Sequence, residues 1–119
     1  MRLLSWNIHK GIGGRDRRYS LQRIIDCIHH ERPDLVCLQE VDRLVHRSDY
    51  DDQPRVLGQT LNFQSIFQAN VPVANGTYGN LILSRWAVGS THRISLKRGI
   101  RKSRGAQLIH VETPEGVIH

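Results

Sequence analysis

The segment at residues 34–40, Asp-Leu-Val-Cys-Leu-Gln-Glu, constrains the fold of this chain more than any other feature. Its apolar core is followed by two polar residues, Gln39 and Glu40. Near-continuous apolar runs of this length are typical of strands that are buried on both faces of a sheet. Reactive groups in such proteins collect where these strands end. The segment therefore predicts a buried strand over residues 34–40 with the Glu40 carboxylate at its mouth.

A second apolar run begins at Leu3 and is followed by the polar residues Asn7, His9 and Lys10. If the two strands are neighbours, Asn7 and Glu40 face each other. A carboxylate and an amide oxygen are hard ligands, and they suit a Mg²⁺ ion that keeps several waters and takes other oxygens from a phosphate. The alternative is that Glu40 only marks the point where a strand reaches solvent, and spacing alone leaves both interpretations open.

Three ordered motifs resemble those of the endonuclease/exonuclease/phosphatase superfamily. They are Trp-Asn-Ile-His-Lys-Gly at residues 6–11, Pro-Asp-Leu-Val-Cys-Leu-Gln-Glu-Val-Asp at residues 33–42 and Tyr-Gly-Asn-Leu-Ile-Leu-Ser-Arg at residues 78–85. Arg-Ile at residues 23–24 and Arg-Gly-Ala at residues 104–106 also match, so the similarity spans nearly the whole chain. The resemblance implies an α/β fold, a sandwich of two sheets with mixed but mainly antiparallel strands, flanked by helices.

The chain is short for that fold. Its 119 residues, 39% hydrophobic and 24% charged, are typical of one globular domain. The superfamily fold needs about twice this length. Residues 112–116 predict a hairpin turn, and residues 117–119 predict the opening of a strand that stops before it is long enough to pair. We therefore expect residues 1–119 to be a single partial domain, the N-terminal half of such a fold, truncated at the C-terminus.

Helical periodicity supports a helix on one face of the sheet. The apolar residues after Ser20 recur at i, i+3, i+4 and i+7, which predicts a helix that ends before Pro33. Ser20 can cap the start of this helix. A second, shorter helix is predicted over residues 54–61. The remaining predicted strands cover residues 2–8, 63–73, 79–84, 88–96 and 107–111.

The basic charge of the chain predicts a phosphate-containing partner. Seventeen Lys and Arg against eleven acidic residues give a net charge of +6. Arginine matches phosphate oxygens with a planar fork, and a positive field speeds encounter with polyanions, so nucleic acid is among the candidate partners. The cations gather at residues 15–18 and at residues 97–104, where five of eight residues are basic. The alternative for the second cluster is a solvated surface, or one whose acidic partner lies in the missing half.

Other features bear on the location of the protein. No run of about 18 apolar residues is present, so no membrane span is expected. The N-terminus lacks the apolar core and cleavage site of a secretory signal. Cys27 and Cys37 are predicted to be free, buried thiols in a helix and a strand. We expect a cytoplasmic location, and no obligate protein partner is evident.

The resemblance implies hydrolysis of phosphoester bonds with a divalent cation, Mg²⁺ or alternatively Mn²⁺. It implies that Glu40 is the metal-binding carboxylate. It also places Asn7 beside metal and phosphate, as a further ligand or catalytic residue that orients a carboxylate or donates to a phosphate oxygen. In the superfamily, later Thr-His-Leu, Gly-Asp-Phe-Asn and Ser-Asp-His motifs position and deprotonate the water, and this sequence contains none of them. We therefore expect hydrolysis from the full-length protein and little or none from residues 1–119.

Four further residues are candidate phosphate contacts: His9, Lys10, Asn80 and Arg104. His9 stands where some relatives carry an acidic residue, which favours a single-metal site, and the alternative for His9 and Lys10 is an outward polar turn. Gly79 would let the backbone approach closely and Asn80 could bond across the site, although a turn that enters a strand accounts for the same residues. For Arg104, an ion pair that supports the site is favoured over direct phosphate contact.

A different class of function stays open, a non-catalytic, arginine-rich nucleic-acid-binding module or a decayed remnant of the enzyme. The two hypotheses differ at Glu40. Its replacement by Gln in the full-length protein should abolish metal-dependent turnover in the first case and leave salt-sensitive binding intact in the second. Within the enzyme class, DNA, RNA, an inositol phosphate and a phospholipid head group all remain candidate substrates.

Overall fold

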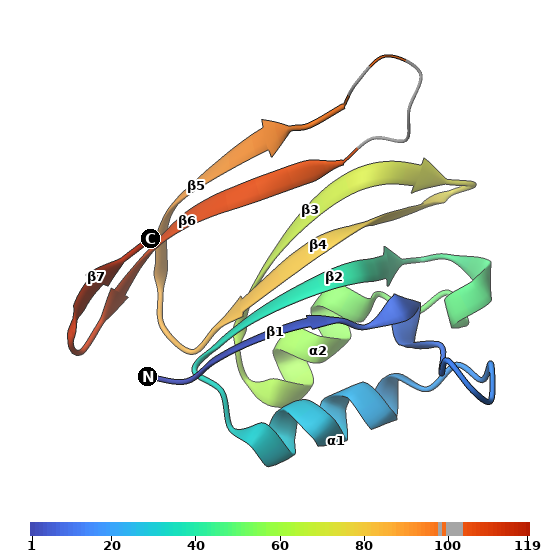
Figure 1. Ribbon diagram of the computed structural model, residues 1–119, viewed down its shortest axis with the longest axis horizontal. Helices are drawn as coiled ribbons and strands as arrows, with labels where there is room; N and C mark the ends of the chain where they lie inside the picture. Colours follow the sequence, from blue (N-terminus) through green and yellow to red (C-terminus); the bar gives the residue numbers. More distant parts are fainter. Residues whose placement is uncertain (98, 100–103) are drawn as a thin grey trace.

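The computed structural model describes residues 1–97, 99 and 104–119, and within them two β-sheets lie against each other with two α-helices on one side (Figure 1). The predicted α/β class is confirmed. The elements in chain order are β1 (Leu3–Asn7), η1 (His9–Gly11), α1 (Leu21–Glu31), β2 (Leu35–Arg43), η2 (His46–Ser48), α2 (Gln53–Leu61), β3 (Gln64–Val73), β4 (Gly76–Ser84), β5 (Val88–Ser95), β6 (Gly105–Thr113) and β7 (Gly116–Ile118), where η denotes a single 3₁₀ turn.

The first sheet has the strand order β1-β2-β4-β3. β1 and β2 are parallel, with Asn7 opposite Gln39, whereas β4 is antiparallel to both β2 and β3. Parallel neighbours need a crossover connection, and α1 supplies it. The parallel pairing brings the carboxyl ends of the first two strands to the same edge of the sheet, as the sequence predicts.

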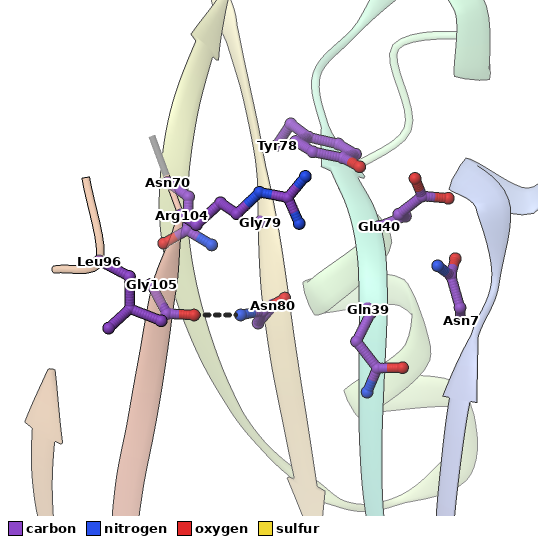
Figure 2. A pocket seen from close by; sticks show the side chains of 10 residues that line it. All are labelled: Asn7, Gln39, Glu40, Asn70, Tyr78, Gly79, Asn80, Leu96, Arg104 and Gly105. Atoms are coloured by element: carbon purple, nitrogen blue, oxygen red, sulfur yellow. Dashed lines mark hydrogen bonds between the residues drawn. The ribbon is translucent and has the colours of Figure 1, made fainter. Parts of the chain in front are cut away.

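The second sheet, β5-β6-β7, is antiparallel and covers the face of the first sheet that lies opposite the helices (Figure 1). Side-chain amides join the two sheets. The Asn80 Nδ2 group donates to the Gly105 carbonyl oxygen at 2.9 Å (Figure 2). The Gln107 Nε2 group donates to the Asn80 carbonyl oxygen at 3.1 Å. Asn80 therefore lies within β4, at the contact between the sheets, and not in a turn.

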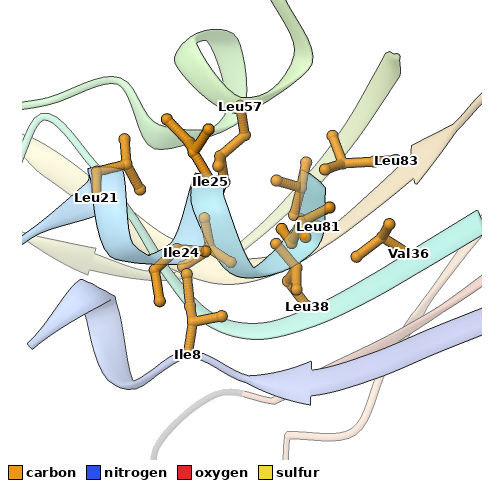
Figure 3. Close-up of a cluster of buried hydrophobic side chains, with 11 residues drawn as sticks. Ile8, Leu21, Ile24, Ile25, Val36, Leu38, Leu57, Leu81 and Leu83 are labelled. Atoms are coloured by element: carbon orange, nitrogen blue, oxygen red, sulfur yellow. The ribbon is translucent and has the colours of Figure 1, made fainter. Parts of the chain in front are cut away.

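The helices pack on the first sheet through apolar side chains (Figure 3). Ser20 caps α1, because its side-chain oxygen accepts a hydrogen bond from the backbone N–H of Arg23 at 3.3 Å. Full burial of an aliphatic side chain contributes about 1.5–3 kcal/mol. The predicted helix, its cap and its buried face are confirmed. The buried members of this core are Ile8, Leu21, Ile24, Ile25, Ile28, Val36, Leu38, Val41, Leu57, Leu81 and Leu83.

Several boundaries differ from the prediction. β2 continues to Arg43 because the polar residues after position 40 still pair with β4, and β4 begins at Gly76. The expectation that the last residues would not pair was wrong, since a tight turn sets Val117 and Ile118 directly against β6. Cys27 is free but exposed, because it lies on the face of α1 that is turned away from the sheet.

Two further expectations concern the second basic cluster and membrane-spanning segments. Most of the second basic cluster, residues 98 and 100–103, lies outside the described residues. Among the helices in the described ranges, none combines the length and the apolar character that crossing a membrane requires.

The backbone of the neighbouring strand β3 approaches closely at Gly79. A Cβ atom at this position would overlap the carbonyl oxygen of Gln68 in the neighbouring strand. We predict that Gly79→Ala lowers the free energy of unfolding by about 1–3 kcal/mol, because overpacking forces the strands apart. Urea denaturation measures this change. Gly14→Ala is the control, since its Cβ would enter open space, and it should change stability by less than about 0.5 kcal/mol. Equal stabilities would contradict the close approach.

Candidate functional site

Glu40 lies in a β-bulge inside β2, not at the end of the strand as predicted. The pairing with β4 shifts register between Leu38 and Val41, and Glu40 has a left-handed φ of 57°. A bulge re-aims the side chain that it carries, and left-handed backbone at a residue other than glycine costs of order 1–3 kcal/mol. The surrounding ladder must therefore stabilise this conformation. The consequence is that the Glu40 carboxylate points along the edge of the sheet where β1 also ends (Figure 2).

The turn after β1 faces the same carboxylate. Asn7 organises this turn, because its Oδ1 atom accepts a hydrogen bond from the backbone N–H of His9 at 3.0 Å. Three consecutive residues then adopt left-handed backbone, with φ values of 49° at His9, 61° at Lys10 and 79° at Gly11. As a result, His9 Nδ1 lies 2.9 Å and Lys10 Nζ lies 3.9 Å from Glu40 Oε2. Both of these basic side chains thus converge on Glu40.

A pocket of about 410 Å³ opens beside Glu40 (Figure 2). Its lining combines amides, one carboxylate, one aromatic ring and one guanidinium group, and comes from β1, β2, β3, β4, the start of β6 and the residues next to β5 and β6. The structure thus gathers four of the six predicted site residues in its wall and the other two against Glu40. The lining residues are Asn7, Gln39, Glu40, Asn70, Tyr78, Gly79, Asn80, Leu96, Arg104 and Gly105.

Tyr78 is the site residue that the sequence analysis missed, although it opens the third motif. Its hydroxyl is turned toward the Glu40 carboxylate (Figure 2). Burial, together with the hydrogen bond and the negative charge of Glu40, raises the pKa of Tyr78 to about 12. Two cations flank its ring, with Lys10 Nζ 5.9 Å and Arg47 Cζ 5.3 Å from the centroid. A tyrosine directly before the Gly-Asn pair was the available sequence signal.

Electrostatics keep Glu40 ionised. Burial by itself would raise the pKa of this carboxyl group, but the hydrogen bond from Tyr78 and the positive charges of Lys10 and His9 outweigh it, and the net pKa lies below the ordinary value. The Glu40 side chain is 26% exposed. Its Oε2 atom is buried, with His9 Nδ1 at 2.9 Å and Lys10 Nζ at 3.9 Å. An ionised carboxylate in the wall of a pocket is a suitable ligand for a cation.

The donor set fits a divalent ion of the magnesium type. The described residues contain no group of three or more His, Cys, Asp or Glu side chains that could enclose a metal. Mg²⁺ does not require such a cage, since it keeps several waters and uses one or two carboxylates together with phosphate oxygens. Glu40 supplies the carboxylate. Asn7 lies beside it, with its amide nitrogen turned toward the pocket and one lone pair of Oδ1 already used by His9 (Figure 2).

The two remaining candidates differ in their freedom to bind a ligand. The Asn80 amide nitrogen is engaged by Gly105, so this side chain also ties the sheets together. Arg104 extends its guanidinium group across the pocket toward Tyr78 (Figure 2). The sequence analysis favoured an ion pair for Arg104, but none of the described residues forms one with it.

A buried polar network lies next to the site, and Asp42 is its central residue. The Asp42 side chain is fully buried, and Arg47 binds both of its carboxylate oxygens at 2.8 Å. Ser48 Oγ donates to the same carboxylate at 3.0 Å. The bidentate pair fixes the Arg47 guanidinium against the Tyr78 ring, so the network connects the loop after β2 to the residue that contacts Glu40.

The fold and the motifs now identify the family. The sequence profile of the endonuclease/exonuclease/phosphatase family matches residues 4–119. The chain belongs to this family. The three motifs place Asn7, Glu40 and Tyr78 on β1, β2 and β4, around the pocket.

Comparisons with individual proteins show the extent of the similarity. The uncharacterized protein YbhP of Escherichia coli K12 is 31% identical over 94 residues, which cover 73% of this chain and 37% of that protein. A family member from Beutenbergia cavernae has the same fold, with a TM-score of 0.78 and 23% identity over 98% of this chain and 36% of its own. The human Nocturnin catalytic domain gives a TM-score of 0.70 and 24% identity over 97% and 45%, respectively. This chain thus spans 37% of the length of the curated relatives that it matches.

Removal of the Arg47 guanidinium should destabilise the protein, because it leaves the buried Asp42 carboxylate without its bidentate partner. We predict that Arg47→Met lowers the free energy of unfolding by about 3 kcal/mol, measured by urea denaturation. Arg55→Met is the matched control, since Arg55 lies at the surface with its Nε atom 3.9 Å from Asp52 Oδ2. Loss of this exposed ion pair should lower the free energy of unfolding by less than about 1 kcal/mol. Similar losses for both variants would contradict a special role for the buried pair.

The contact between Tyr78 and Glu40 can be tested by titration. Glu40→Gln removes the negative charge, so the pKa of Tyr78 should fall from about 12 toward 10.0 but stay above it, because burial remains. The measurement is an NMR titration of ¹³Cζ-labelled tyrosine, with the signal assigned through Tyr78→Phe. Glu115→Gln, in the exposed turn before β7, should leave the pKa unchanged. An unaltered Tyr78 pKa in Glu40→Gln would rule out the contact.

Proposed function

We propose that the whole protein hydrolyses phosphoester bonds with a divalent cation, Mg²⁺ or alternatively Mn²⁺, for which Glu40 and Asn7 provide ligands from this part of the chain. The observation that carries the proposal is the state of Glu40. This carboxylate is ionised, is re-aimed by a bulge, and lines an open pocket beside the basic side chains of His9 and Lys10.

The remaining groups of the pocket suit a phosphate ester. A bound divalent cation would polarise the phosphoryl group and stabilise the departing oxygen. The Asn7 Nδ2 group donates to no other described residue, so it is free to donate to a phosphate oxygen. Lys10 contributes positive charge beside Glu40, and the Arg104 guanidinium can match two phosphate oxygens with its planar fork. Tyr78 holds the Glu40 carboxylate in place.

The described functions of structural relatives are consistent with this chemistry. The Nocturnin structure contains a bound sulfate, a tetrahedral anion like phosphate. ANGEL2 is a 2′,3′-cyclic phosphatase, and its structure with adenosine-2′,3′-vanadate has a TM-score of 0.63 to this chain. The motifs that the family resemblance assigns to water activation are not in this sequence, so we propose the activity for the full-length protein and expect little from residues 1–119.

The decisive variant is Glu40→Gln in the full-length protein. We predict that it lowers Mg²⁺-dependent hydrolysis of bis-p-nitrophenyl phosphate and p-nitrophenyl phosphate by at least about 100-fold, because loss of a metal ligand should exceed the 10- to 100-fold effect of its supporting groups. Glu115→Gln should retain wild-type turnover. Retained turnover in Glu40→Gln would contradict the metal assignment.

Binding measurements separate the enzyme from the alternative class. If the wild-type protein hydrolyses neither substrate but binds nucleic acid with an affinity that falls steeply with salt, the non-catalytic binding module is favoured. In that case Glu40→Gln should bind as well as wild type or more tightly, because it removes one negative charge from a basic surface.

A further inference from the structure

Gln53, the first residue of α2, is a fully buried polar side chain that lies outside the pocket. Each end of its amide has a backbone partner. Its Oε1 atom accepts a hydrogen bond from the Asp42 N–H at 2.8 Å, and its Nε2 group donates to the Lys10 carbonyl oxygen at 2.9 Å. The Tyr19 hydroxyl lies 3.4 Å from the same Nε2 group. We call this connection from β2 through Gln53 to the turn after β1 the Gln53 bridge.

The Gln53 bridge joins the two segments of left-handed backbone that carry the site. On one side, Lys10 is the middle residue of the three that have positive φ. On the other side, Asp42 lies two residues beyond Glu40 and its bulge. Each segment costs free energy and needs support from its surroundings. A single buried amide that bonds to both segments can fix the distance between the His9 and Lys10 side chains and the Glu40 carboxylate.

We infer that Gln53 is a positioning residue, whose buried amide holds the His9–Lys10 turn at the spacing from Glu40 that the site requires. This inference rests on the proposed phosphoesterase function for its catalytic consequence. Its geometric content, that the turn after β1 depends on Gln53, stands apart from any activity.

The chemistry of the bridge requires glutamine. It needs an acceptor at one end for the Asp42 N–H and a donor at the other for the Lys10 carbonyl oxygen, and a neutral amide provides both. Glutamate keeps the acceptor but cannot donate when ionised, and methionine has a similar volume without either group. The substitutions Gln53→Glu and Gln53→Met therefore separate the two halves of the bridge. Gln59→Met is the matched control, because Gln59 is exposed on the same helix.

Amide hydrogen exchange in the full-length protein tests the geometry directly. The N–H groups of Gly11 and Ile12 report on the turn, since they donate to the carbonyl oxygens of Ile8 and His9 at 2.9 and 3.0 Å. We expect both to exchange at least about tenfold faster in Gln53→Met, because the turn loses a buried hydrogen bond. The buried Leu57 amide of α2 should keep its protection, which excludes general unfolding. In Gln53→Glu the Asp42 amide should stay protected while the turn opens.

Steady-state kinetics test the catalytic consequence. A displaced supporting group typically costs 10- to 100-fold in metal affinity or activity, so kcat in Gln53→Met, corrected for the folded fraction, should fall by about this factor. Gln59→Met should match wild type in both exchange and kcat. A merely structural role for Gln53 would change the melting temperature without changing kcat per folded molecule.

The outcomes separate this inference from the proposed function. Unchanged exchange of Gly11 and Ile12 in Gln53→Met would overturn the bridge. Faster exchange with an unchanged kcat would overturn the positioning role. If the wild-type protein does not hydrolyse phosphoesters, the proposed function fails and the catalytic role of Gln53 fails with it, while the exchange data still decide whether the turn depends on Gln53.

Discussion

The parallel pairing of β1 and β2 is the constraint on which the rest of the site depends. It places Asn7 opposite Gln39, so that the residues following each strand meet at one edge of the sheet. The pairing is stabilised by the buried residues of α1, which must cross over the sheet to connect the two strands. A register shift of one residue would turn the side chains of β2 to the opposite faces and remove both the core contacts and the site.

Local strain and buried polar contacts support one another around this edge. Glu40 and the turn after β1 adopt left-handed backbone. Both lie close to Asp42 and to its hydrogen-bond partners Gln53 and Arg47. The Asp42 backbone bonds to Gln53 and its carboxylate bonds to Arg47, so one residue connects the turn to the ring of Tyr78. Buried polar networks are stabilising only when their members are satisfied, and nearly every polar group in this one has a partner. The Glu40 carboxylate lies in the pocket wall next to this network, with His9 and Lys10 beside it.

Much of the fold could be predicted from the sequence because it follows from periodicity and composition. The capped helix from Leu21 and the buried strand around Val36 were predicted with nearly correct limits, since their apolar spacing matches one element each. The polar residues were harder to interpret. Asp42 and Arg43 lie beyond the predicted end of the strand at residue 40, yet they continue β2, because an ion pair and a neighbouring strand satisfy them. Asn80 suggested either a turn or a contact across the site, and its amide in the pocket wall also joins the two sheets.

The sequence by itself determined the family and the α/β class, and it predicted the carboxylate and the amide that line the pocket, because short motifs and apolar patterns are local properties. Only the tertiary structure decided how these groups are aimed. The bulge at Glu40, the approach of Tyr78 and the bridge through Gln53 each join residues that are distant in the sequence. Such contacts depend on strand register and on which polar groups become buried together, and a linear pattern does not encode either one locally.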